Sequence, residues 1–237
     1  MNILKFKNLK ENKRKIIFTS IFAAAVVFLS VLIAVLNITF TTNVSSKQYC
    51  LDNMLSHILA VSEKQHSVYD EEASGEVRSY ISSTLFSYGV ENEIITHNDV
   101  YVYDEKTEQI FTYKPKNIYA EIEGESGMNV LLVAHYDSCG YKIKYDEPSE
   151  GSHGALDDGY GVATVLELAR IFSSANLKNG IKLAILDAEE EGVLGSEALV
   201  NEYPQWLDDV NLVINLEGRG NKGPLYLFQT SDNNSKV

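Results

Sequence analysis

"LLVAHYDSCG", residues 131–140, places a histidine and an aspartate directly after an apolar run. The run from Val130 to Ala134 is short, uncharged and rich in branched residues, which is typical of a strand buried on both faces. Side chains two positions apart share a face of a strand, so we expect His135 and Asp137 to lie side by side where the strand leaves the core. A carboxylate there can hold one imidazole nitrogen and leave the other for a metal or a proton. The alternative, from this stretch alone, is a surface histidine beside an unrelated acid.

Helix-like and strand-like patterns divide the chain into two parts that differ in the order of their predicted helices and strands. The first part has helical patterns at residues 48–60 and 72–88, followed by strand-like stretches at 93–96, 100–103, 109–113 and 117–122. After the strand that contains His135, the patterns are a helix at 159–173, a strand at 181–186, a helix at 194–202, and strands at 210–216 and 225–229. An antiparallel portion followed by such alternation predicts an α/β fold in which helices sandwich a mixed central sheet.

The apolar positions of the two N-terminal helical patterns indicate the faces that we expect to be buried. In the first pattern these positions are Leu51, Met54, Leu55, Ile58 and Leu59, and in the second they are Val77, Ile81, Leu85 and Phe86. Gly89 directly follows the second pattern and is expected to end that helix. The polar stretch "DEKTE", residues 104–108, separates two strand-like stretches and predicts a hairpin.

Residues 16–36, "IIFTSIFAAAVVFLSVLIAVL", form a 21-residue stretch without a charged side chain. At about 1.5 Å per helical residue, this stretch reaches about 30 Å, the thickness of a bilayer core. We therefore predict a transmembrane helix at 16–40, with a cleaved signal peptide as the alternative. A basic tail at 1–15 precedes this helix, and a polar linker at 41–47 leads to one domain at 48–237.

Charge is distributed unevenly along the chain. Residues 1–15 contain six basic residues and one acid, a net charge of +5, so the remaining residues carry −18 of the total of −13. Basic flanks stay on the cytoplasmic side of a membrane, which predicts a cytoplasmic N-terminus and an extracytoplasmic domain. We expect no nucleic-acid partner, because an acidic domain lacks the basic surface that nucleic acids require.

The chain contains two cysteines, Cys50 and Cys139. They lack the spacing of metal ligands, so they predict no cysteine metal site. A disulfide between them is compatible with an extracytoplasmic compartment, but two unpaired thiols are equally compatible with the sequence.

Each central strand-like stretch is followed by polar residues. Besides His135 and Asp137, these are found in "GALDDGYG" (154–161), "LDAEEEGVLGS" (186–196) and "INLEGRG" (214–220). Functional groups of open α/β sheets gather at the carboxyl ends of the strands, so we expect these side chains to converge. One histidine with several acids suits a pair of divalent cations about 3.5–4 Å apart, bridged by a carboxylate.

Taken singly, each acidic stretch has a simpler explanation. Asp157 and Asp158 suit the first turn of the helix that follows them. The glutamates at 189–191 suit a solvated turn, and Glu217 is able to pair with Arg219 or with a distant lysine. Their joint occurrence at one edge of a sheet favours the metal site.

Together, "AHYDS", "GALDDGYGV", "LDAEEEGVLGS" and "INLEGRG" resemble the di-zinc aminopeptidase family. That family includes bacterial leucyl aminopeptidases, glutamate carboxypeptidase and the transferrin receptor ectodomain, and the likeness covers roughly residues 115–230. The ending "NLEGRG" looks most similar to the membrane-anchored branch, the endoplasmic-reticulum metallopeptidases and vacuolar membrane proteases. The resemblance implies a membrane-anchored, zinc-dependent exopeptidase that hydrolyses peptides with a metal-activated water.

The resemblance also implies a role for each site residue. Its zinc ligands match His135, Asp157, Glu190 and Glu217. Asp157 matches the carboxylate that bridges the two ions, which in this family often precedes a cis peptide bond. Glu189 matches the general base, and Asp137 matches the acid that orients His135.

The resemblance is incomplete at its C-terminal end. The family's last zinc ligand is a histidine downstream of the Glu217 position, and none of the five histidines of this chain follows Glu217. We therefore expect a C-terminally truncated domain (a fragment, a split gene or a decayed copy) with one tight zinc site, or a separate chain that completes the domain. His153 is an alternative source of the missing ligand. The rival functions are a non-catalytic ectodomain used for binding and a decayed fragment without activity.

Overall fold

The computed structural model describes residues 50–144 and 147–218 of the chain. The predicted basic tail, transmembrane helix, linker and last strand lie outside the described residues. The described residues belong to one compact unit, Cys50–Val237. Within them, every helix is too short or too polar to span a bilayer.

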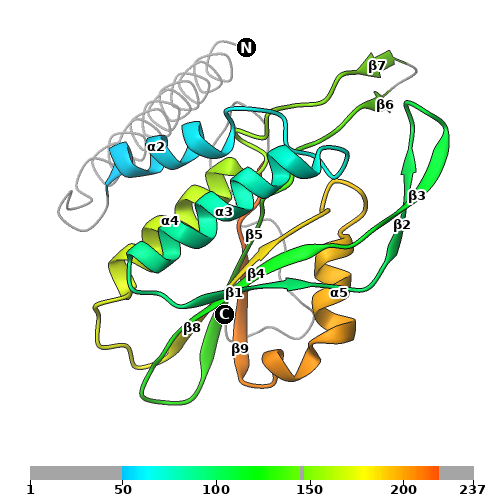
Figure 1. Cartoon of the computed structure of the whole chain (residues 1–237). Helices are drawn as coiled ribbons and strands as arrows, with labels where there is room; N and C mark the ends of the chain where they lie inside the picture. Colours follow the sequence, from blue (N-terminus) through cyan, green and yellow to red (C-terminus); the bar gives the residue numbers. More distant parts are fainter. Residues whose placement is uncertain (1–49, 145–146, 219–237) are drawn as a thin grey trace, which may run out of the picture. The chain divides into compact units, whose positions relative to one another are not determined.

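A five-stranded sheet forms the centre of this unit, in the order β1-β4-β8-β5-β9 (Figure 1). Its strands are β1 (Asn92–Thr96), β4 (Lys116–Ile122), β8 (Gly180–Leu186), β5 (Asn129–His135) and β9 (Val210–Asn215). β4 pairs antiparallel with both β1 and β8, whereas β5 pairs parallel with both β8 and β9. The predicted mixed sheet is therefore confirmed.

Helices cover both faces of the sheet, so that the strands contribute to two apolar cores. On one face lie α2 (Leu51–Val61), α3 (Glu71–Ser87) and α4 (Gly159–Phe172), and on the other lie α5 (Leu194–Glu202) and the short 3₁₀ helix η1 (Pro204–Leu207) (Figure 1). Successive side chains of a strand point to opposite faces, so neighbouring residues belong to different cores. In β5, Leu132 belongs to the core under α2, α3 and α4, and Leu131 packs with Leu199 and Trp206 in the other core. The continuous apolar run that predicted a doubly buried strand is explained by these two layers.

Two hairpins stand outside the central sheet. The predicted one pairs β2 (Val100–Asp104) with β3 (Gln109–Tyr113), and the Asp104 carboxylate caps its turn by accepting from the backbone N–H of Lys106 at 2.9 Å. The other pairs β6 (Lys142–Lys144) with β7 (Glu147–Ser149) and was not predicted. Its strands have three residues each, too few to display an alternating pattern.

The buried face predicted for α2 is wrong for its three leucines. The helix packs on α4, and its buried residues are Met54, His57 and Val61, whereas Leu51, Leu55 and Leu59 are 71%, 55% and 63% exposed. His57 is tolerated in this buried position because its two ring nitrogens lie 2.7 Å from the Tyr80 hydroxyl and 3.1 Å from the Tyr88 hydroxyl. The pattern of apolar residues does not predict this arrangement, because histidine is classed as a polar residue.

The predicted face of α3 is confirmed at Val77, Ile81 and Leu85, which are buried against the sheet. The prediction that Phe86 belongs to this buried face is wrong, because its side chain is 74% exposed. The helix ends as predicted before Gly89, whose φ of +77° lies in the left-handed region that glycine adopts without strain.

These two neighbouring positions of α3 provide a direct test of the fold. Leu85→Ala should lower the free energy of unfolding by about 2–5 kcal/mol, because it leaves a cavity in the main core. Phe86→Ala should change it by about 0.5 kcal/mol or less, since the ring is mostly in solvent. Urea unfolding of the detergent-solubilised protein, followed by the fluorescence of the single tryptophan, Trp206, measures both. Equal losses for the two variants would contradict the orientation of α3.

Candidate metal centre

The carboxyl ends of three parallel strands meet at one edge of the sheet. β5 ends at His135, β8 leads into the turn that carries Glu189 and Glu190, and β9 is followed by Glu217. The segment that leads into α4 brings Asp157 to the same edge. The polar residues that the sequence places after separate strands are thus gathered here, as expected for a mixed α/β sheet.

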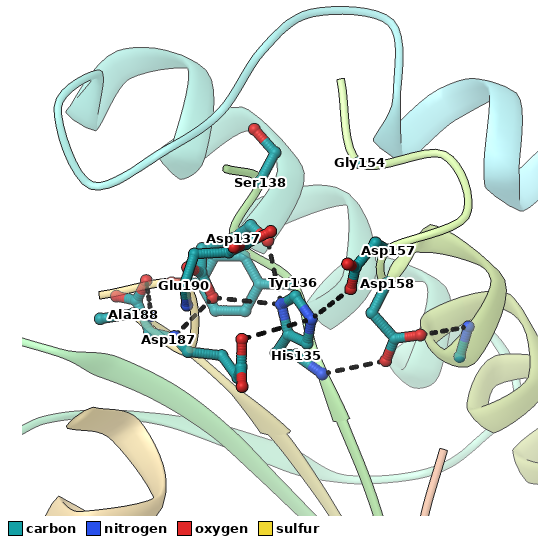
Figure 2. A network of polar contacts seen from close by, with 12 residues as sticks. His135, Tyr136, Asp137, Ser138, Gly154, Asp157, Asp158, Asp187, Ala188 and Glu190 are labelled. Carbon is teal, nitrogen blue, oxygen red and sulfur yellow. Dashed lines mark hydrogen bonds and ion pairs between the residues drawn. The ribbon is translucent and has the colours of Figure 1, made fainter. Parts of the chain in front are cut away.

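His135 lies at the centre of a group of carboxylates (Figure 2). Its Nε2 atom is 3.1 Å from Asp157 Oδ1, 3.5 Å from Glu217 Oε1 and 3.8 Å from Glu189 Oε2. Among the described residues, His135, Asp157 and Glu217 form a group whose donor atoms all lie within 4.8 Å of one another. The imidazole is buried, whereas the Asp157 and Glu217 side chains remain accessible to solvent.

The other nitrogen of His135 is held by the chain itself. Nδ1 lies 3.0 Å from the backbone oxygen of Asp137 and 3.4 Å from its carboxylate. An Nδ1–H that donates to this oxygen leaves the Nε2 lone pair directed at the acids, which is the tautomer that binds a metal.

The donor set suits zinc. Burial by itself would lower the pKa of His135, but hydrogen bonds to Asp137, Asp157 and Glu217 raise it well above its usual range. Carboxylates that stabilise a positive charge at this point would also attract a divalent cation. Imidazole nitrogen and carboxylate oxygen are both zinc ligands, and a site with three protein ligands leaves a fourth position open.

Asp137 organises the turn after β8 as well as the imidazole. Its buried carboxylate accepts hydrogen bonds from the backbone N–H of Glu189 at 2.9 Å and of Glu190 at 3.2 Å. Ala188, just before these residues, has a φ of +55°, so the chain turns sharply between the strand and the two glutamates. One carboxylate therefore positions the histidine and both glutamates.

The two aspartates before α4 have different surroundings, and Asp158 is the one that caps the helix. Asp158 is buried; its carboxylate accepts from the backbone N–H of Gly161 at 3.1 Å, as the N-cap of α4, and from the backbone N–H of His135 at 3.3 Å. Asp157 instead lies against the His135 ring. The peptide bond between the two aspartates is cis. Burial raises the pKa of Asp158 to about 8, although nearby His135 opposes the shift.

Glu189 and Glu190 are partly buried beside the histidine. Burial raises the pKa of Glu189 to about 7, with His135 opposing the shift and Glu217 and Asp137 adding to it. A carboxyl group with a pKa near 7 can accept and return a proton at neutral pH. Burial also raises the pKa of Glu190, and repulsion by Asp157 and Asp137 adds to this shift.

Asp187 holds the start of the turn that carries Glu189 and Glu190, and the sequence did not lead us to predict this role. Its buried carboxylate accepts from the Tyr113 hydroxyl at 2.8 Å, from the backbone N–H of Lys116 at 2.9 Å and from that of Ala188 at 2.9 Å. Burial raises the pKa of Asp187 to about 6. The available signal was an aspartate at the end of an otherwise apolar buried strand, where an acid needs partners.

Three other residues considered from the sequence, His153, Cys50 and Cys139, are not part of this group of donors. His153 is exposed, with Nδ1 3.1 Å from the backbone oxygen of Ser62. Cys50 and Cys139 are not joined by a disulfide. His135, Glu189 and Glu217 line one part of a cavity of about 430 Å³, whose other walls are mainly apolar side chains of β5, β9 and α5.

Comparison with known proteins identifies related sequences and folds. The profile described as "Peptidase family M28" matches residues 117–237, half of the chain. The vacuolar membrane protease of Candida glabrata is 34% identical over 148 residues, covering 61% of this chain and 14% of that protein. The vacuolar membrane protease of Kluyveromyces lactis is 32% identical over 185 residues, covering 76% and 17%. The chain thus spans about one sixth of the length of these relatives.

Solved structures share the fold at lower identity. A Zn-dependent exopeptidase from Parabacteroides distasonis superposes with a TM-score of 0.61 at 21% identity, covering 75% of this chain and 64% of that one. A glutaminyl cyclase from Porphyromonas gingivalis superposes with a TM-score of 0.62 at 21% identity, covering 74% and 63%. At these identities the likeness concerns the fold alone.

The geometry predicts that His135 decides metal binding and that His153 does not. His135→Ala should lower zinc affinity by more than the about 10–100-fold that loss of a supporting contact costs, because it removes the only nitrogen donor of the group. His153→Ala should leave the affinity unchanged. Competition with a chromogenic chelator measures both. Retention of zinc by His135→Ala, or its loss from His153→Ala, would place the ion elsewhere.

Proposed function

Because the chain belongs to peptidase family M28, we propose that it acts as a membrane-anchored, zinc-dependent exopeptidase of the aminopeptidase type. The observation that carries this proposal is the convergence of His135, Asp157 and Glu217, with the Glu189 carboxylate 3.8 Å from the imidazole. Its substrates would be peptides bound in the cavity beside these residues.

In this proposal the acids have separate tasks. His135, Asp157 and Glu217 would hold one zinc ion tightly, and Glu190 would contribute, with Asp157, to a second and weaker site. When bound, zinc lowers the pKa of water towards about 7 and polarises a peptide carbonyl. Asp137 positions the His135 ring through its backbone carbonyl, and it positions the turn that carries both glutamates through its carboxylate.

Glu189 moves the proton. Its carboxylate accepts a proton from the attacking water and then returns it to the nitrogen of the leaving amine. A pKa of about 7, raised chiefly by burial, suits a group that must do both at neutral pH. Glu189 is free to do this because its hydrogen bond to Asp137 involves the backbone N–H and not the carboxylate.

A binding role without catalysis is the alternative on the same fold. A purely binding ectodomain has no need of a half-buried glutamate with a raised pKa beside a metal-ligand group. The glutaminyl cyclase neighbours share the fold only, whereas the relatives above 30% identity are proteases. These two points favour the peptidase.

We further propose that residues 16–40 cross a membrane, with residues 1–15 in the cytoplasm and the domain at 48–237 outside it. The membrane proteases among the relatives support association with a membrane. The uncharged stretch at 16–36 is long enough to cross a bilayer, and the basic residues before it favour a cytoplasmic N-terminus. Protease added to intact cells should degrade the domain. Survival of the domain until the membrane is broken would reverse the orientation.

The two adjacent glutamates should respond differently to the same change. Glu189→Gln should keep its zinc and lower the rate of hydrolysis of fluorogenic aminoacyl amides by about 10²–10⁴-fold, because an amide cannot accept the proton. Glu190→Gln should lower zinc content as well as rate, because it weakens a proposed ligand. Zinc content by elemental analysis and kcat, measured on the same samples, separate the two effects.

The reverse pattern would exchange the two roles. If Glu189→Gln lost zinc while Glu190→Gln retained it, the general base would be Glu190. Full activity in Glu189→Gln would contradict the proposed proton transfer altogether.

A further inference from the structure

The outer surface of α2 is a stripe of leucines. Leu51, Leu55 and Leu59 recur every four residues and therefore lie on one side of the helix, and all three are more than half exposed. We call these three residues the leucine face. The only charged residue in α2 is Asp52, near its N-terminal end.

The neighbouring helix of the same layer has a different outer surface. The exposed positions along most of α3 are polar: Glu72, Glu76, Ser79 and Ser83. Scattered exposed apolar residues are ordinary in soluble domains, but a continuous apolar stripe indicates a contact surface. The leucine face therefore distinguishes α2 from α3, where Phe86 is the only large apolar side chain that is mostly exposed.

The sequence before α2 indicates which partner this is. Lys47 is the only charged residue between Ile16 and Leu51. Fourteen residues, 37–50, separate the uncharged stretch at 16–36 from the helix, and a fully extended chain of that length spans at most about 50 Å. A segment that crosses a bilayer would therefore keep the leucine face within about 50 Å of the membrane surface, close enough for the face to reach it.

We propose that the leucine face lies on the bilayer from which the chain emerges, with its leucines inserted at the boundary between the headgroups and the acyl chains. This proposal rests on the membrane anchor proposed above and is independent of the peptidase activity. Because the leucine face contains no basic residue, it requires no anionic lipid, and a zwitterionic bilayer suffices. The strongly acidic domain would in any case be repelled by an anionic surface.

The contacts of α2 carry its orientation to the metal centre. At its N-terminal end, the backbone N–H of Cys50 donates to Glu167 of α4 at 2.7 Å. At its C-terminal end, the backbone oxygen of Ser62 contacts His153, in the segment that leads to Asp157 and α4. A docked α2 would thus fix how the site faces the membrane.

A fluorescent label tests the docking in the full chain. Cys50 and Cys139 are replaced by serine, and one new cysteine is introduced by Leu55→Cys or, as the matched control on α3, by Ser83→Cys. Each variant is labelled with an environment-sensitive dye and reconstituted into phosphatidylcholine vesicles, with or without lipids that carry a quenching nitroxide. The label at position 55 should shift to the blue and lose most of its emission to the nitroxide lipid. The label at position 83 should show neither effect and should be quenched by aqueous iodide.

A second variant and a separate readout complete the test. Leu51→Ser with Leu59→Ser, added to the position 55 variant, should abolish the blue shift and the nitroxide quenching while the chain still resists alkaline carbonate. Extraction of the parent chain by carbonate would refute the anchor, whatever the label reports. Iodide quenching at position 55 in an anchored chain would overturn the docking. Shielding from both quenchers would also overturn it, since another protein surface would then cover the leucines.

Discussion

The contact between the buried His135 ring and the acids around it is the interaction on which the site depends. Asp137 holds the Nδ1 side of the ring, so Nε2 faces Asp157, Glu217 and Glu189. Such a concentration of negative charge beside a buried group is costly unless a positive charge balances it, and a divalent cation meets this requirement. Burial at the same place, with Glu217 and Asp137 adding to it, raises the pKa of Glu189 to the range of a general base.

The fold makes this contact through the parallel pairing of β8, β5 and β9. Since these strands run in the same direction, their ends deliver residues far apart in the sequence to one edge of the sheet. Buried polar groups then hold the turns: Asp158 joins the start of α4 to β5, and Asp187 fixes the residue before the two glutamates. The precision of the site therefore comes from acids that touch no substrate in the proposed reaction.

Much of this arrangement is predictable from the sequence because apolar runs, followed by acids at strand ends, specify both the sheet and the edge at which those acids gather. The mixed sheet, the hairpin at residues 104–108 and the end of α3 at Gly89 are confirmed. The failures have physical causes. In α2, the buried face contains a histidine with two tyrosine partners and not the leucines from which the buried face was predicted. The strands β6 and β7 have three residues each, too few to show an alternating pattern. The support given by Asp187 depends on tertiary contacts that no local spacing reveals.

The central claim is that His135, Asp157 and Glu217 form a metal centre at the sheet edge. Anomalous diffraction at the zinc absorption edge, from crystals of the zinc-loaded protein, tests it most directly. We expect a peak at about 2.0–2.2 Å from His135 Nε2 and from carboxylate oxygens of Asp157 and Glu217. A zinc peak bound by other residues, or no peak near His135 in fully loaded crystals, would contradict it.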